Sequence, residues 1–299
     1  MSSTPYVLYT NIYTLEGSEP KHNKYLDMYF LWLANIIKYG NIQKTDVVVT
    51  YMDEETYTYL NVTKTEKNRL FQVLKKQIDT FVIIKYPVPP NHKEGMLRKY
   101  AVDMMLDYTK PIHDKFPIYM YLDVDVLVVK DIRKLTLQIE IVDTSSPDKT
   151  TLFLRNESNP ITHPDYFGQL MTSEDKQLLI DRNIALPGFS AGIFGWRNNI
   201  VIKEIFNMVL RLALESDKTF YTIEQPFFNA ALFHYMFYDQ TKFMFLIMSR
   251  TQIAQNVIGA HVSPTNVLVN YCGEPGDQSI HWDKLYHQLL AQLLFTEKI

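Results

Sequence analysis

The sequence has almost no cysteine and no long hydrophobic run. Cys272 is the only cysteine, so the chain can form no internal disulfide, which fits a reducing compartment. The opening residues MSSTPYVLYTNIY contain neither a basic segment nor a continuous apolar segment, so no signal peptide is apparent. No stretch reaches the ~18 uninterrupted apolar residues of a membrane-spanning helix. We therefore expect a cytoplasmic protein.

An excess of charge of one sign is also lacking. The formal net charge is −3, and no basic stripe is present, which argues against binding to a nucleic-acid backbone. The hydrophobic content of 46% is that of a globular protein, so wholesale disorder is excluded. No repeat and no linker rich in proline, glycine or serine interrupts the chain. We expect a single domain over residues 1–299.

Apolar runs alternate with amphipathic segments in the first half of the chain. Strands are predicted at residues 6–12, 46–51, 80–86 and 119–129, and helices at 24–39, 66–78 and 93–108. This alternation predicts an α/β fold with a mostly parallel central sheet and helices on both faces. The second half is less regular: it predicts short strands at 151–155, 185–196, 242–247 and 267–272, helices at 201–215, 224–238 and 281–295, and an insertion at 160–183.

The run YMYLDVDVLVV, residues 119–129, carries two carboxylates, Asp123 and Asp125. On one strand these two side chains would share a face, about 7 Å apart. Burying two neighbouring carboxylates is unfavourable unless a cation compensates, and ligands of parallel sheets bind beyond the carboxyl ends of the strands. The pair therefore predicts a site for Mn²⁺ or Mg²⁺, with Asp125 as the direct ligand and Asp123 sharing the metal. Two acids on an exposed strand or turn are the structural alternative.

Two further segments contain candidate binding residues. The segment ALPGFSAGIFGW, residues 185–196, is rich in small residues, which let a ligand approach the backbone closely. A bulged strand with tight turns explains the same pattern. Glu224 and Gln225 stand at the start of a predicted helix, where an acid is favoured by the helix dipole even without a functional role.

The order of motifs resembles the GT-A type of glycosyltransferase, and most of all the retaining family eight, which includes glycogenin and galactinol synthase. The resemblance rests on LYTNIY (8–13), MLRKYAVDMM (96–105), YLDVDVLVVKDI (121–132), and GFSAGIF (188–194) with EQPFFN (224–229). It implies a GT-A fold, a nucleotide-binding half at 1–130, and a sugar- and acceptor-binding half at 131–299. It also implies a nucleotide-sugar donor, with UDP as the carrier, and retention of anomeric configuration.

The resemblance assigns roles to individual residues. It implies donor-binding roles for Leu8, Thr10, Asn11, Tyr13, Lys99, Asp123, Ser190, Ala191, Gly192 and Gly273. It implies catalytic roles for Glu224 and Gln225, and metal binding by Asp123, Asp125 and Asn270. Lys99 falls where the family places a lysine that reaches the donor phosphates.

The sequence departs from the family pattern at several positions. Asn270 stands where the family has a metal-binding histidine, with His261 and His281 as alternatives. The family also has a phosphate-binding lysine near the C-terminus, but no lysine occurs here between Gly273 and Lys284. Ser190 replaces the usual asparagine and Glu224 the usual aspartate. These changes concern metal affinity and donor choice rather than the fold.

Three other functions compete with a metal-dependent glycosyltransferase. A phosphatase of the haloacid dehalogenase type would carry its aspartate pair near the start of the chain, with Thr or Val where this chain has Leu127. A nucleotidyltransferase would have a glycine-rich basic loop, which residues 10–24 lack. The third is a catalytically inactive GT-A fold that acts as a binding or interaction protein. The acceptor (glycan, protein or small molecule) is not readable, and a homo-oligomer remains open.

Overall fold

The computed structural model describes residues 4–109, 117–135, 149–197, 200–239, 242–255, 263–271, 287–288 and 291. Its helices include α1 (Tyr25–Tyr39), α2 (Glu54–Asn61), α3 (Glu66–Lys75), α4 (His92–Leu97), α5 (Asp103–Thr109), α7 (Ser173–Asp181), α8 (Ile202–Glu215) and α9 (Gln225–Phe237). Its strands are β1 (Tyr6–Ile12), β2 (Val47–Asp53), β3 (Phe81–Tyr86), β4 (Ile118–Leu122), β5 (Val126–Val128), β6 (Thr150–Pro160), β7 (Pro187–Arg197), β8 (Phe243–Ile247), β9 (Ile253–Gln255) and β10 (Leu268–Asn270). In the described residues no helix is long and apolar enough to cross a membrane.

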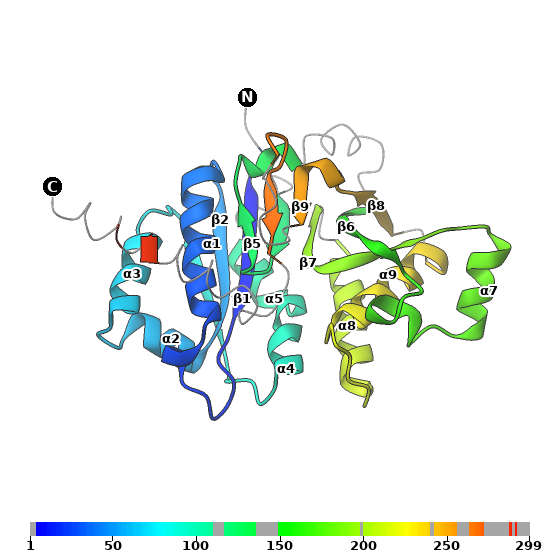
Figure 1. Cartoon of the computed structure of the whole chain (residues 1–299), viewed down its shortest axis with the longest axis horizontal. Helices are drawn as coiled ribbons and strands as arrows, with labels where there is room; N and C mark the ends of the chain where they lie inside the picture. Colours follow the sequence, from blue (N-terminus) through cyan, green and yellow to red (C-terminus); the bar gives the residue numbers. More distant parts are fainter. Residues whose placement is uncertain are drawn as a thin grey trace.

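A seven-stranded sheet forms the centre of the molecule, in the order β3-β2-β1-β4-β7-β6-β8 (Figure 1). Strand β7 runs antiparallel to both of its neighbours, and the other pairs are parallel. The predicted fold class, α/β with a mostly parallel central sheet, is confirmed. Because β4 is flanked by β1 and β7, whatever follows β4 emerges in the middle of the sheet.

Helices cover both faces of this sheet. In β1 every residue is buried, and successive side chains enter two different cores. Leu8 packs in the core that also holds Leu33 of α1 and Phe71 of α3, whereas Tyr9 packs in the core that holds Phe206 of α8. Figure 1 shows α1, α2 and α3, in blue and cyan, toward one end of the molecule, and α7, α8 and α9 toward the other.

A small second sheet continues directly from the central one. It has the order β5-β10-β9, with β10 antiparallel to β5 and parallel to β9. Since β5 starts at Val126, the two aspartates lie in the connection between the two sheets.

This connection corrects the prediction of one strand over 119–129. Strand β4 ends at Leu122, and the N–H of Val126 donates to the carbonyl oxygen of Asp123 at 3.0 Å, which makes a turn. Asp123 and Asp125 therefore do not share a strand face. The turn bends the chain out of the central sheet, so the pair does not have to fit into a β ladder.

The prediction of a single helix over 93–108 is also wrong. The chain forms α4, a single 3-10 turn η2 (Arg98–Tyr100), and then α5. Ala101 interrupts the helix with φ −81° and ψ 65°, and the hydroxyl of Tyr51 donates to the Ala101 carbonyl oxygen at 2.9 Å. The freed carbonyl is thus satisfied by a side chain from β2.

Most other predicted elements are confirmed to within a few residues at each end, among them the helices over 24–39, 201–215 and 224–238. Helix α2 was not predicted; it begins after Asp53, whose carboxylate accepts from the N–H groups of Glu55 and Thr56. The strand predicted over 151–155 is longer, since β6 extends to Pro160. The helix predicted over 281–295 lies almost entirely outside the described residues.

Candidate active site

The aspartate pair lies at the carboxyl end of β4, where the sequence predicted it. The N–H of Asp123 donates to the carbonyl oxygen of Gly192 on β7 at 2.9 Å, so the residue is still tied to the sheet edge. Its carboxylate accepts a hydrogen bond from the hydroxyl of Tyr121, two residues earlier on β4. The side chain is 28% exposed, which leaves it open to a ligand.

The lack of a side chain at Gly192 leaves room for the Asp123 carboxylate. A β-carbon built on Gly192 would lie 2.5 Å from Asp123 Oδ2, closer than real contacts permit. The small-residue segment predicted over 185–196 is therefore needed for the close approach of a side chain. The backbone there also serves the site, because the Ala191 carbonyl oxygen accepts from Lys99 Nζ at 2.9 Å.

Lys99 is the centre of the site, and it is fully buried. Its ammonium lies 2.6 Å from Glu224 Oε1 and 3.6 Å from Asp123 Oδ1. It also lies 4.7 Å from the centre of the Tyr121 ring. Burial alone would lower the pKa of Lys99, but the two carboxylates outweigh it and raise the pKa above its usual value.

The buried position of Lys99 changes its expected role. A donor phosphate contact was predicted, but the ammonium is enclosed by Glu224, Asp123 and the Ala191 carbonyl. In this structure the lysine joins η2, the end of β4, β7 and the start of α9. Sequence reasoning missed this ion pair because its members lie far apart in the chain.

Glu224 and Gln225 are brought together with the rest of the site. Gln225 Oε1 accepts from the Ala191 N–H at 3.1 Å, and its Nε2 donates to the Asp165 carbonyl at 3.3 Å. One turn further on, Asn229 bonds both the N–H and the carbonyl of Phe189 at 2.8 Å. The polar residues of EQPFFN thus hold the start of α9 against β7, and the Glu224 side chain does not cap the helix.

Asp125 is partly buried and lies across the turn from Asp123. Burial, and after it the charge of Asp123, raise the pKa of Asp125 to about 8, while Lys99 and Arg155 oppose the rise. Two neighbouring carboxylates with this electrostatic cost fit a site that is completed by a cation.

Asn270 belongs to the same neighbourhood. It pairs with Val126 in the small sheet, and the N–H of the following Tyr271 donates to the Asp125 carbonyl oxygen at 2.9 Å. The described residues contain no group of three His, Cys, Asp or Glu side chains that could hold a metal. The available donors are hard oxygens from two carboxylates and one amide, a set that fits Mn²⁺ or Mg²⁺ when a substrate supplies further oxygens.

The predicted residues of β1 are only partly brought to the site. Leu8 is a core residue inside the strand, so the structure does not support a donor contact for its side chain. Thr10 is fully buried. The Asn11 amide donates to the Gly95 carbonyl and accepts from the Tyr86 hydroxyl, both at 2.8 Å, which ties β1 to α4 and β3.

The pKa of Tyr13 responds to the charges of the site. Burial raises its pKa, and Glu224 and Asp123 contribute to the rise. Its ring lies against Gly95, where a β-carbon would come within 2.5 Å. Ser190 is buried, and its hydroxyl accepts from the Gly192 N–H at 3.2 Å. Gly273 lies outside the described residues, as do His261 and His281.

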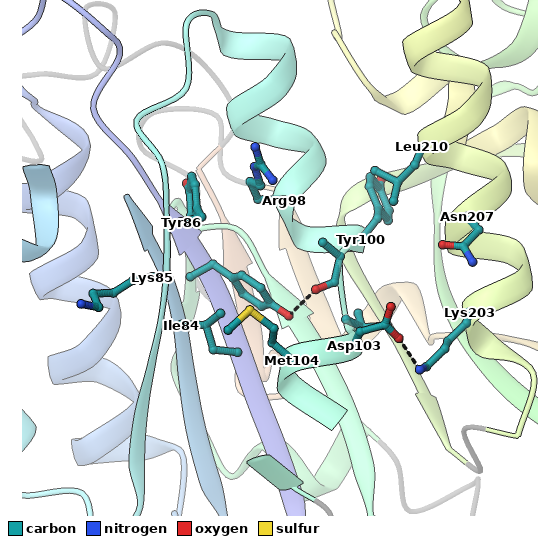
Figure 2. Close-up of a pocket in the computed structure, with 13 residues that line it drawn as sticks. Ile84, Lys85, Tyr86, Arg98, Tyr100, Asp103, Met104, Lys203, Asn207 and Leu210 are labelled. Atoms are coloured by element: carbon teal, nitrogen blue, oxygen red, sulfur yellow. Dashed lines mark hydrogen bonds and ion pairs between the residues drawn. The ribbon is translucent and has the colours of Figure 1, made fainter. Parts of the chain in front are cut away.

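A separate pocket of about 200 Å³ lies next to the segment that carries Lys99 (Figure 2). It is lined by residues of β2, β3, η2, α5 and α8, and none of the predicted site residues lines it. The Arg98 guanidinium lies 5.2 Å from the centre of the Tyr86 ring, and Asp103 forms an exposed ion pair with Lys203. Figure 2 also draws the hydrogen bond to the Ala101 carbonyl that holds this segment in place.

No family model matches the chain, and no curated protein matches it. Among solved structures it is similar to mouse xyloside xylosyltransferase 1 in its apo form, at 13% identity and a TM-score of 0.49, over 90% of this chain and 98% of that one. It is also similar to a glycosyltransferase involved in the glycosylation of the major capsid of PBCV-1, at 12% identity and a TM-score of 0.47, over 94% of this chain and 100% of that one. At these values the function has to be argued from the side chains of the site.

Proposed function

We propose that the protein is a metal-dependent glycosyltransferase that moves a sugar from a nucleotide-sugar donor, a UDP-sugar, to an acceptor with retention of configuration. The observation that carries the proposal is the arrangement at the carboxyl end of β4. Two carboxylates, Asp123 and Asp125, stand beside a buried ion pair between Lys99 and Glu224. The order of sequence motifs that resembles family eight supports the same activity.

Asp123, Asp125 and Asn270 would hold the metal. A divalent cation bound to a nucleoside diphosphate stabilises the negative charge that develops on this leaving group. The protein's own contribution is to fix the carboxylates before substrate arrives. Gly192 and the Tyr121 hydroxyl fix Asp123, and the small sheet fixes the backbone of Asp125.

Glu224 and Gln225 would face the sugar. Lys99 holds the Glu224 carboxylate in the site, and the Ala191 N–H orients the Gln225 amide. Retention requires either a carboxylate nucleophile near the anomeric carbon or a same-face displacement, and both remain open. We assign Lys99 a positioning role, because its ammonium is enclosed by protein groups.

The test is hydrolysis of a panel of UDP-, GDP- and dTDP-sugars with Mn²⁺, Mg²⁺ or EDTA. We expect slow release of one nucleotide that depends on metal and is abolished in Asp125→Ala. That variant should remain folded by circular dichroism. Full activity of Asp125→Ala in excess metal would overturn the assignment of Asp125 as a metal ligand.

Two observations favour a second candidate, a catalytically inactive GT-A fold that binds a partner. The Lys99 ammonium is already occupied by protein acceptors, and Asn270 provides an amide where the resemblance expects an imidazole. A protein of this kind would hydrolyse no donor and show no metal-dependent nucleotide binding by calorimetry. The same panel therefore separates the two candidates.

A further inference from the structure

A small pocket lined by two arginines lies at β6, two strands away from β4 in the central sheet. Its volume is about 100 Å³, room for roughly three water-sized groups. It is lined by Arg155, Asn156, Ser158, Met248, Arg250 and Ile253. The resemblance to glycosyltransferases assigned no role to any of these residues.

The topology places this pocket next to the candidate active site. On β7, Ile193 pairs with Leu122 of β4 and Phe194 pairs with Leu154 of β6. Asp123 directly follows β4 and Arg155 follows Leu154 within β6, and the two strands run parallel on either side of β7. Arg155, which lies within β6, is thus level with Asp123 along the strand direction, two strand spacings or about 10 Å away.

One residue of the small sheet lines the pocket. Ile253 is the first residue of β9, which pairs with β10, and β10 pairs with the strand that begins directly after Asp125. The small sheet thus connects the pocket with the turn that carries the aspartate pair.

The pocket carries more positive than negative charge. Arg155 is 5% exposed and forms an ion pair with Glu157 at 3.2 Å. Arg250 donates to Asn156 Oδ1 at 3.0 Å and to the Glu157 carbonyl at 2.8 Å. In the part of the chain that the structure describes, no carboxylate lies within ion-pair distance of Arg250. The lining thus provides two guanidinium groups, and planar guanidinium donors match phosphate and carboxylate oxygens.

We propose that this pocket binds an anionic oxygen group, phosphate or carboxylate, of a substrate whose reacting end lies at the aspartate pair. The proposal rests on the proposed function and adds a charged group to the description of its substrate. The group belongs either to the donor diphosphate or to an acidic acceptor. The lack of a lysine between Gly273 and Lys284, where the resemblance places a phosphate-binding lysine, leaves a role for another cation near the donor.

The experiment is isothermal titration calorimetry with uridine, UDP, inorganic pyrophosphate and inorganic phosphate, in the presence of Mn²⁺. Arg250→Met is the first variant, because Arg250 is exposed and its removal leaves the Arg155–Glu157 pair in place. Arg155→Lys is the second; it keeps the buried charge and removes the planar fork. Arg182→Met, an exposed arginine next to α7, is the matched control.

Two results support the proposal and distinguish its sources. If the group belongs to the donor, both pocket variants bind UDP and pyrophosphate about tenfold more weakly, as expected for one lost charge-assisted hydrogen bond, and uridine equally well. If it belongs to the acceptor, UDP binding is unchanged. Inorganic phosphate then binds to the UDP- and Mn²⁺-loaded protein, and this binding weakens about tenfold in the variants.

Identical binding of all these anions by wild type and both pocket variants would overturn the proposal. So would the absence of any phosphate or pyrophosphate binding by the wild type. A wild type that binds no UDP and hydrolyses no donor, but binds phosphate in a manner sensitive to Arg250, would refute the glycosyltransferase and retain the anion pocket.

Discussion

Lys99 Nζ lies 2.6 Å from Glu224 Oε1, and both side chains are buried. The pair joins η2 to the first turn of α9, across the end of the central sheet. A buried charge that loses its partner destabilises a protein by about 3–5 kcal/mol. We therefore expect Lys99→Met to lower the free energy of unfolding by about 3 kcal/mol or more, because Glu224 and Asp123 then face one another without a cation. Urea denaturation measures this change.

Two control variants make this prediction specific. Lys99→Met combined with Glu224→Gln should recover part of the loss, since one of the uncompensated charges is gone. Lys203→Met removes one member of the exposed pair with Asp103 and should change stability by less than about 1 kcal/mol. A Lys99→Met protein as stable as the Lys203→Met protein would show that the buried pair contributes nothing.

The strands could be predicted from the sequence because apolar runs of this length between polar turns have few alternatives. The side of the sheet on which each side chain lies could not be predicted. Every position of β1 is buried, and each face of the strand carries both apolar and polar residues, Leu8 with Thr10 and Tyr9 with Asn11. The sequence therefore shows no alternation that distinguishes the two faces. The resemblance placed Leu8 at the donor, whereas the structure places it in the core.

The aspartate pair was found from the sequence because two acids in an apolar run are conspicuous. The turn that separates them was not found, since it depends on pairing between Val126 and Asn270, which is a tertiary contact. Tyr121 could have been recognised, because it precedes Asp123 by two residues, the spacing at which side chains of an extended chain lie on the same side. The sequence around Arg155 contains no motif that predicts a functional role for this residue.

The pKa of Asp125 predicts a dependence of stability on pH. The carboxyl has a pKa of about 8 in the folded protein, raised by burial and by Asp123, against 3.8 when unperturbed. Between these values the folded state keeps a proton that the unfolded state has lost. The stability contribution is therefore fully present at low pH and decreases as the pH rises toward about 8.

Urea denaturation in EDTA at a series of pH values from about 5 to 8 measures this slope. Asp125→Asn should flatten it, because the amide does not titrate. Asp217→Asn, at an exposed position, should leave it unchanged. A slope that persists undiminished in Asp125→Asn would assign the proton to another group.

Asn270→His tests the proposal that Asn270 is the third metal ligand. Asn270 is buried in β10 and paired with the strand that follows Asp125. Imidazole is a stronger ligand than an amide carbonyl for Mn²⁺, so we expect the variant to bind Mn²⁺ about tenfold more tightly. Calorimetric titration with Mn²⁺ measures the affinity directly, with Asn156→His as the control at another asparagine. Unchanged affinity in Asn270→His would remove Asn270 from the ligand set.

Gly192→Ala tests whether the position of the Asp123 carboxylate matters for turnover. The added methyl group would lie 2.5 Å from Asp123 Oδ2, so the carboxylate has to move. Displacement of a catalytic group by about 1 Å can reduce the rate on the order of a hundredfold, and we expect a loss of that size in kcat/KM for donor hydrolysis. Mn²⁺ affinity should fall in the same variant.

Gly17→Ala is the matched control for this change. Gly17 has a φ of +77°, and a β-carbon added there would have no atom within 4 Å, so alanine strains the backbone without touching the site. It should lower stability by about 1 kcal/mol and leave kcat/KM unaltered. Equal loss of activity in both variants would mean that general destabilisation, rather than the approach of Gly192 to Asp123, explains the effect. Wild-type activity in Gly192→Ala would show that the Asp123 carboxylate tolerates displacement, and the proposed metal site would then depend on Asp125 alone.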